Sequence, residues 1–228
     1  MRRRYFELLL SKYINRENSL NKIKLYRGGY GAGLFYLIGD ILGGLITPEY
    51  NYIKNAVSEL IQAGAENRIF LSSFLFVHAW MIILFSAGIL IHHPFHKNRA
   101  LNIAGILLLI VGLAHLLSSS IFPQDPVGAQ FTSAGIIHLV LVGITVIFII
   151  IIMPLFGLGL THEISRKSFR IFTFISLAII LIFGICTPIA ISKGIEVIGL
   201  TERITAYTFY IWMFVLAHLL LKEKSKDI

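Results

Sequence analysis

Cysteine and charged residues are both scarce in this chain. Cys186 is the single cysteine among 228 residues, so an intrachain disulfide is excluded, and Cys186 stands in no metal-binding or redox motif. Only 14% of the residues are charged whereas 56% are hydrophobic, and the mean hydropathy is +0.79. A water-soluble domain of this length could not bury so much apolar surface. The composition therefore predicts a polytopic membrane protein.

The apolar residues fall in runs of about 20, the length that crosses a bilayer as an α-helix. We predict six spans, at residues 30–48, 69–92, 101–122, 132–156, 171–191 and 204–221. Gly39 and Gly43 lie four residues apart in the first span, a spacing that favours close helix packing in membranes. The predicted fold class is all-α, a bundle of six transmembrane helices.

Residues 1–28 form a basic arm that carries eight of the 20 Lys and Arg residues. Aromatic and aliphatic residues alternate with these cations, which is typical of an amphipathic segment lying on an anionic inner leaflet. No nucleic-acid-binding module accompanies the cations, so nucleic acid is not expected as a partner. The predicted domains are the arm at 1–28, a transmembrane domain at 29–222 and a tail at 223–228.

Lys and Arg are unevenly divided between the two sides of the predicted bundle. Sixteen of the 20 fall in the arm, the 93–100 loop, the 157–170 loop and the tail, and only four lie on the opposite side. Cytoplasmic loops carry the excess of cations in membrane proteins. Both termini are therefore predicted to be cytoplasmic, in a multi-pass protein of the plasma membrane.

Three outer segments connect the spans. Residues 49–68 include apolar residues at helical spacing from Ile53 to Ile61, which predicts a short interfacial helix after the first span. Residues 123–130 combine Pro, Asp and Gly, which favour a tight turn. Residues 193–205 contain the motif GLTERI and lead into the last span.

Short motifs in these segments carry a family resemblance. AVSELIQAGAEN follows the first span, FPQD ends the third, a His comes early in the fourth, and GLTERI precedes the sixth. In order and spacing they resemble a bacterial and archaeal membrane family, catalogued as domain of unknown function 998, over about residues 30–221. The resemblance implies a six-span membrane fold but no established activity. The matching residues are Ser58, Glu59, Leu60, Phe122, Pro123, Asp125, His138, Gly199, Glu202 and Arg203.

Four ionisable residues, Asp40, His78, His115 and His138, lie on four different predicted spans. At a helical rise of about 1.5 Å per residue, they lie about 8 to 15 Å below the outer ends of these spans. Such residues are costly in a bilayer and usually face a bundle interior or a wet cavity. We therefore expect a pocket open to the outer face that binds a lipid or a small polar ligand. Its predicted residues are Asp40, Ser58, Glu59, His115, Ser119, Asp125, His138, Glu202 and Arg203.

Other chemistries would use the same residues. The three histidines and Asp40 would hold Zn²⁺ in a membrane-embedded hydrolase acting on a lipid, with Ser118 or Ser119 polarising a substrate oxygen. His115 and His138 would instead ligate haem b. Asp40 would be the titrating group of a proton- or ion-coupled carrier, although repeat halves are not visible. The sequence assigns no cofactor, leaves the oligomeric state undetermined, and does not decide whether the protein is an enzyme.

Structural roles compete with each of these functions. A histidine inside a bundle can simply hydrogen-bond a neighbouring helix. Asp125 would bond to its own turn. Arg203 would balance one of the carboxylates Asp40, Glu59 or Asp125, or bind a phosphate head group. Glu202 and Arg203 are adjacent, so on a helix they point in different directions.

Overall fold

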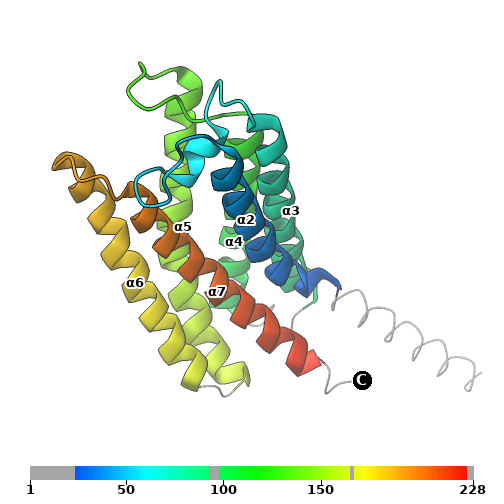
Figure 1. Cartoon of the computed structure of the whole chain (residues 1–228). Coiled ribbons are helices and arrows are strands. Elements are labelled where there is room, and N and C mark those ends of the chain that lie inside the picture. Colours follow the sequence, from blue (N-terminus) through cyan, green and yellow to red (C-terminus); the bar gives the residue numbers. More distant parts are fainter. Residues whose placement is uncertain (1–23, 93–97, 165–166, 225–228) are drawn as a thin grey trace, which may run out of the picture.

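A computed structural model describes residues 24–92, 98–164 and 167–224, and these ranges contain six long α-helices and one short 3-10 helix. Each of the six is long and apolar enough to cross a bilayer, which confirms the predicted six-span, all-α fold. Most of the basic arm and part of the tail lie outside the described residues. The elements are α2 Gly28–Ile46, η1 Val57–Ile61, α3 Arg68–His92, α4 Arg99–Ser120, α5 Ser133–Ile164, α6 Lys167–Ser192 and α7 Ile198–Lys224 (Figure 1).

The helices pack as a ring. Each packs against its neighbours in the sequence, and α7 also packs against α2. Residues 47–67, 121–132 and 193–197 connect helices at one end of the bundle, which we call the η1 end. The first described residue and the end of α7 lie at the opposite end, which we call the terminal end (Figure 1).

Helix boundaries differ most from prediction in α5 and α7. Helix α5 continues to Ile164 with Pro154 inside it, and α7 begins at Ile198, six residues before the predicted start of its span. Glu202 and Arg203 therefore lie inside α7 rather than in the connection before it. The prediction from apolar residues missed the first turn of α7, because two charged residues interrupt the apolar pattern there. In the fold, these two side chains have polar partners inside the bundle.

The predicted interfacial helix is one turn of 3-10 helix, η1. Val57, Leu60 and Ile61 are each 3% exposed, whereas Ile53 is 52% exposed and lies before the turn. The turn packs into the bundle end instead of lying flat on it. Gly43 permits this, because a Cβ added there would come within 2.6 Å of Leu60 Cδ1. The small-residue face predicted on the first span thus receives η1 as well as α3.

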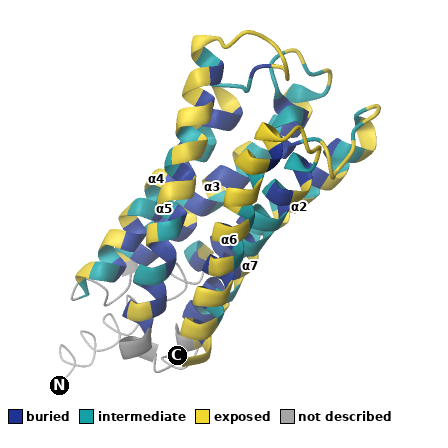
Figure 2. Ribbon diagram, turned by 90° about the vertical axis from the view of Figure 1, so that its left-hand side faces the viewer, coloured by how far each residue is buried: buried dark blue, intermediate teal, exposed yellow. Residues whose placement is uncertain are grey.

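Aromatic side chains fill the ring at the terminal end. Trp212 is completely buried, and its ring lies within 6.2 Å, centroid to centroid, of Phe156, Phe169 and Phe209. Its indole N–H donates to Thr173 Oγ1 at 2.9 Å, which satisfies a buried donor. These contacts tie α5, α6 and α7 together in this half of the bundle. Figure 2 shows the buried inner faces of the helices and their exposed outer faces.

Candidate functional site

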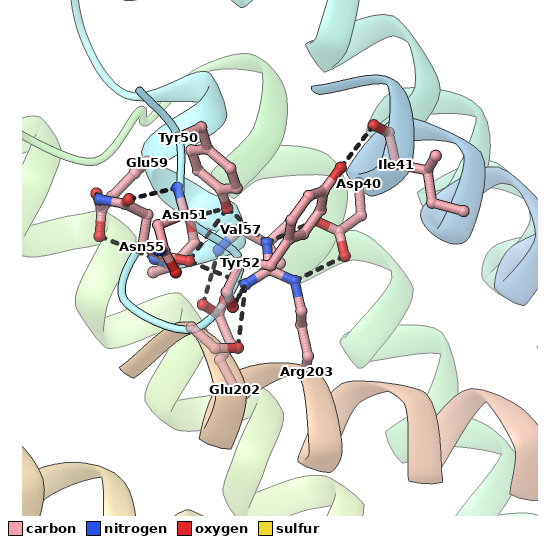
Figure 3. A network of polar contacts seen from close by, with 12 residues as sticks. Asp40, Ile41, Tyr50, Asn51, Tyr52, Asn55, Val57, Glu59, Glu202 and Arg203 are labelled. Carbon is pink, nitrogen blue, oxygen red and sulfur yellow. Dashed lines mark hydrogen bonds and ion pairs between the residues drawn. The ribbon is translucent and has the colours of Figure 1, made fainter. Parts of the chain in front are cut away.

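Asp40 on α2 and Arg203 on α7 form an ion pair inside the bundle near the η1 end (Figure 3). Nε and Nη2 of Arg203 donate to the two carboxylate oxygens of Asp40 at 2.9 and 2.7 Å. Asp40 is completely buried and Arg203 is 6% exposed, so each charge depends on the other for compensation. Of the three carboxylates considered as partners of Arg203, the fold selects Asp40, and the pair joins α2 to α7.

The other N–H groups of Arg203 are also engaged. Nη1 donates to the carbonyl oxygens of Tyr52, Asn55 and Gly199 at 2.6, 2.9 and 3.1 Å, and Nη2 donates to the Tyr50 hydroxyl at 2.6 Å. The guanidinium carbon also lies 5.5 and 4.9 Å from the ring centroids of Tyr50 and Tyr52, within cation–π range. Every nitrogen of the guanidinium therefore has an acceptor inside the chain, and these contacts leave no donor for a phosphate group.

Two tyrosines complete this network, and sequence reasoning missed the part they play. The Tyr207 hydroxyl donates to Oδ2 of Asp40. The Tyr50 hydroxyl donates to the Ala56 carbonyl at 2.8 Å. Burial raises the pKa of the Tyr50 phenol above its ordinary value, so the phenol stays protonated at neutral pH. Tyr207 follows Arg203 by four residues, so a polar stripe on one face of the last helix was the available signal.

The first turn of α7 lies directly against the 50–56 segment. Leu200 N donates to the Ile53 carbonyl at 3.0 Å. A Cβ added at Gly199 would lie 2.2 Å from the Asn55 carbonyl oxygen and 2.6 Å from that of Tyr52. A glycine is therefore required here by close backbone approach. The GLTERI motif thus contributes both the glycine and the arginine that fasten α7 to the loop.

Glu202 points to a different side of α7 from Arg203, as their adjacency predicted. Its Oε2 accepts a hydrogen bond from Val57 N at 2.9 Å, which holds the start of η1 against the first turn of α7 (Figure 3). Glu202 is only partly buried, unlike Asp40.

Glu59 caps η1 through both of its carboxylate oxygens. Its Oε1 accepts from Ala56 N at 2.9 Å, and its Oε2 accepts from Asn55 Nδ2 at 2.8 Å. Ser58, the neighbouring candidate, is partly buried. The motif Ser-Glu-Leu therefore supplies a capping carboxylate and a buried Leu60, both of which shape the turn.

Asp125 organises the turn between α4 and α5. Its two carboxylate oxygens accept from Thr132 N at 2.8 Å and from Thr132 Oγ1 at 2.7 Å. Thr132 Oγ1 in turn accepts from Gly135 N at 3.1 Å, so Thr132 is the N-cap of α5. The turn also meets the η1 segment, because Ala63 N donates to the Gln124 carbonyl at 2.8 Å. Asp125 therefore has the structural role expected for a turn aspartate.

The histidine of α3 has a partner on each ring nitrogen. His78 is completely buried; its Nδ1 lies 2.8 Å from the Ala32 carbonyl and its Nε2 lies 3.2 Å from the Tyr210 hydroxyl. A carbonyl only accepts, so Nδ1 donates and Nε2 accepts from Tyr210. The ring of His115, on α4, meets that of His78 edge-on with centroids 5.0 Å apart. The fold therefore brings these two histidines together.

The remaining polar candidates of α4 and α5 also have hydrogen-bond partners within the chain. His138 Nδ1 lies 2.9 Å from the Phe122 carbonyl, which ties α5 to the end of α4. Ser118 and Ser119 donate to carbonyl oxygens one turn back in α4, at 3.1 and 3.4 Å. These serine hydroxyls are thus engaged within their own helix.

The residues of the zinc hypothesis do not form one cluster. Both oxygens of Asp40 are bound by Arg203, and both ring nitrogens of His78 have partners. Within residues 24–92, 98–164 and 167–224, no three His, Cys, Asp or Glu side chains are placed together to hold a metal ion. The arrangement therefore gives a hydrogen-bonded core near the η1 end rather than a set of converging ligands.

Helices α5 and α6 touch in the terminal half and separate toward the η1 end (Figures 1 and 2). On α5, a Cβ added at buried Gly157 would lie 2.9 Å from Thr173 Cγ2 of α6. Further toward the η1 end on the same face of α5, Val146 is 43% exposed and Leu139 is 50% exposed. Between them, a Cβ added at Gly143 would have nothing within 4 Å.

The stripe of α6 that faces α5 shows the same change in solvent exposure. Thr173 is completely buried and Leu177 is 9% exposed. Toward the η1 end, Gly184 and Pro188 are exposed and Ile191 is 57% exposed, and a Cβ at Gly184 would also have nothing within 4 Å. We call this wedge, bordered by Leu139, Gly143, Val146, Gly184 and Pro188, the α5–α6 opening.

The solvent exposure of the ring-facing side of α7 changes along the helix in the same way as on α5 and α6. Glu202, Ala206, Phe209 and Met213 follow at three- or four-residue spacing and so share one face. Phe209 and Met213 are 1% and 0% exposed, which shows that this face points into the ring. Glu202 and Ala206, nearer the η1 end, are only partly buried. This face of α7 is therefore fully buried in the terminal half and only partly buried near the η1 end.

A separate small cavity lies under η1. Its volume is about 10 Å³, the space of about one water molecule, and its lining is apolar. It is bordered by Gly39, Val57, Leu60, Ile61, Leu71 and Leu75. Its size excludes an organic ligand.

The comparisons with known proteins agree with this architecture. A family model described as a protein of unknown function (DUF998) matches residues 30–219, which include the ion pair, the α4–α5 turn and the GLTERI motif. Comparison with curated proteins and with solved structures gives no match. The six-span chain, with its Asp40–Arg203 pair and its capped turns near the η1 end, therefore belongs to the DUF998 family, whose function is unknown.

Proposed function

We propose that the protein binds a membrane lipid through the α5–α6 opening, with the lipid head group beside Glu202 and an acyl chain between the two helices. The observation that supports this most directly is the parallel change in exposure on α5, α6 and α7. On each helix, the stripe that faces the ring is buried in the terminal half and more exposed near the η1 end. The partly buried Glu202 then lies where a head group would enter.

The bilayer itself supplies an occupant for the opening. The borders of the wedge are apolar except for backbone, so lipid chains fill it at membrane depth. An acyl chain gains little free energy by moving from lipid to such a wedge, because both surroundings are hydrocarbon. Selectivity for one lipid must therefore come from polar contacts with its head group.

The orientation of the protein follows from its cations in this proposal. The excess of Lys and Arg at the terminal end favours cytoplasmic termini in the plasma membrane, so the opening faces the outer leaflet. The basic arm then rests on the anionic inner leaflet.

The carrier and hydrolase hypotheses receive less support from the contacts. Asp40, the candidate titrating group of a carrier, has both oxygens bound by Arg203 and one also by Tyr207, which leaves it no free oxygen for a transported ion. Lipid binding without assigned chemistry is therefore the function that the geometry supports best.

A variant that fills the opening tests this proposal. Gly143→Trp places a large side chain in the wedge, and Ile137→Trp is the matched control on the same helix, because Ile137 is 38% exposed and lies off the Leu139–Gly143–Val146 stripe. The measurement is the amount and kind of phospholipid retained by each purified protein, read by native mass spectrometry. We expect the unchanged protein and the control to retain lipid and Gly143→Trp to lose it. Equal retention by all three proteins would contradict the proposal.

A further inference from the structure

The carboxylates near the η1 end are not equally compensated. Asp40 is paired with Arg203, and Glu59 accepts hydrogen bonds from two neighbours at the start of η1. Glu202 accepts one hydrogen bond, from Val57 N to Oε2, and within the described parts of the chain its Oε1 has no hydrogen-bond partner. Glu202 is therefore the one of these three carboxylates with an oxygen available to a ligand.

Arg203 cannot compensate Glu202 by contact, although it is the next residue. Its Nε and Nη2 bind Asp40, its Nη1 binds three carbonyl oxygens, and Nη2 also binds Tyr50. Glu202 lies on another side of the helix, on the face that Phe209 and Met213 continue into the core. A partly buried carboxylate at this depth is costly unless a cation or several donors reach it.

These contacts lead to a ligand class. We infer that the lipid bound through the α5–α6 opening carries a primary ammonium in its head group, and that this ammonium binds Oε1 of Glu202. The inference rests on the proposed lipid site. A primary ammonium supplies both the missing positive charge and N–H donors for a charge-assisted hydrogen bond. An anionic head group is disfavoured at this position, because Arg203 has no free donor to bind it and Glu202 repels it.

The test compares lipids that differ only in the head group. The full chain is reconstituted in vesicles with equal amounts of phosphatidylethanolamine, phosphatidylcholine and phosphatidylglycerol that carry the same acyl chains. Lipid retained after mild extraction is then identified by native mass spectrometry. We expect the ethanolamine lipid to be enriched over the glycerol lipid by about tenfold or more. The trimethylated choline lipid, which has no N–H donor, should be retained less than the ethanolamine lipid.

The informative variant is Glu202→Gln, which keeps a side-chain oxygen for Val57 N but removes the charge. It should abolish the preference for the ethanolamine lipid while still retaining lipid. Glu59→Gln is the matched control, since its carboxylate is engaged within η1, and its preference should match that of the unchanged protein. A thermal unfolding curve for each variant confirms that the fold is kept.

The outcomes separate this inference from the proposed function. If Gly143→Trp loses lipid but Glu202→Gln keeps the ethanolamine preference, the assignment of the ammonium to Glu202 is wrong and the lipid site stands. If the unchanged protein retains all three lipids equally, or prefers the anionic one, the ammonium inference is wrong. If Gly143→Trp and Ile137→Trp retain lipid alike, the lipid site itself is wrong.

Discussion

The guanidinium of Arg203 binds both carboxylate oxygens of Asp40, at 2.9 and 2.7 Å, and so joins α7 to α2 across 163 positions of sequence. The same guanidinium binds the carbonyl oxygens of the loop that leads into η1. One side chain therefore closes the helix ring and holds the loop across its end. This geometry and the α5–α6 opening give three predictions, and the distribution of Lys and Arg gives a fourth.

Removing one partner of the ion pair should strongly destabilise the protein. Arg203→Leu leaves the buried Asp40 carboxylate without its counter-charge, and Asp40→Leu leaves Arg203 in the same state. Each should lower the free energy of unfolding by about 3–5 kcal/mol. The measurement is a denaturant titration of the purified protein in detergent.

The double variant is the control for that prediction. Asp40→Leu combined with Arg203→Leu removes both charges together, so it should cost clearly less than the sum of the two single changes. Simple additivity would show that the two residues do not depend on each other.

Gly199→Ala should separate α7 from the loop. The added Cβ would lie 2.2 Å from the Asn55 carbonyl oxygen, and backbone must move to admit it. We expect a loss of about 1–3 kcal/mol in the free energy of unfolding, together with faster hydrogen exchange of the Val57 and Leu200 amides. Gly184→Ala is the matched control, because a Cβ at Gly184 meets nothing within 4 Å, and it should leave both quantities unchanged or improve stability slightly. Equal free energies of unfolding and equal exchange rates for the two alanine variants would show that Gly199 is not needed for the contact between α7 and the loop.

Paired cysteines should report the separation of α5 from α6. In a Cys186→Ser background, Gly157→Cys with Thr173→Cys should form a disulfide, because a Cβ at Gly157 would lie 3.2 Å from that of Thr173. A shift of about 0.3 Å brings the two atoms to the roughly 3.5–4.5 Å that disulfides span. Val146→Cys with Gly184→Cys lies the same number of residues toward the η1 end on each helix and should not form one. Gel mobility under oxidising and reducing conditions gives the result. Efficient cross-linking of both pairs would show that the two helices stay together along their length.

The side on which the termini lie is predicted by the cation distribution. A reporter fused after residue 228 should be active only in the cytoplasm, and one inserted at Gly128 in the α4–α5 turn only on the outer side, since that turn contains no Lys or Arg. Gly128 has a φ of 80° and open space around it, so an insertion there disturbs little. Activity of the terminal fusion on the outer side would reverse the orientation.

The fold was predictable from sequence to a large extent, and the site only in part. Runs of apolar residues located all six helices, because the bilayer imposes both the length and the composition of a span. The six-residue error at the start of α7 arose because hydropathy treats Glu202 and Arg203 as solvated, whereas the fold surrounds them with polar partners. The predicted pocket stays a prediction. Four of its residues, Asp40, Glu59, Asp125 and Arg203, are bonded to other groups of the protein, and these partners could not be read from the sequence.

The sequence by itself determined that this is a six-span helical membrane protein, that polar side chains gather near one end, and that turns bounded by Pro, Asp and Gly join its helices. These features follow from local composition and spacing. Only the tertiary structure decided that Arg203 binds Asp40 rather than Glu59 or Asp125. It also decided that Glu202 binds Val57 N through Oε2, while its Oε1 has no hydrogen-bond partner among the described residues. The packing of the helices likewise decided that α5 and α6 separate toward the η1 end. Such pairings depend on which helix faces lie opposite each other, and residues distant in the chain meet only when the whole ring is packed.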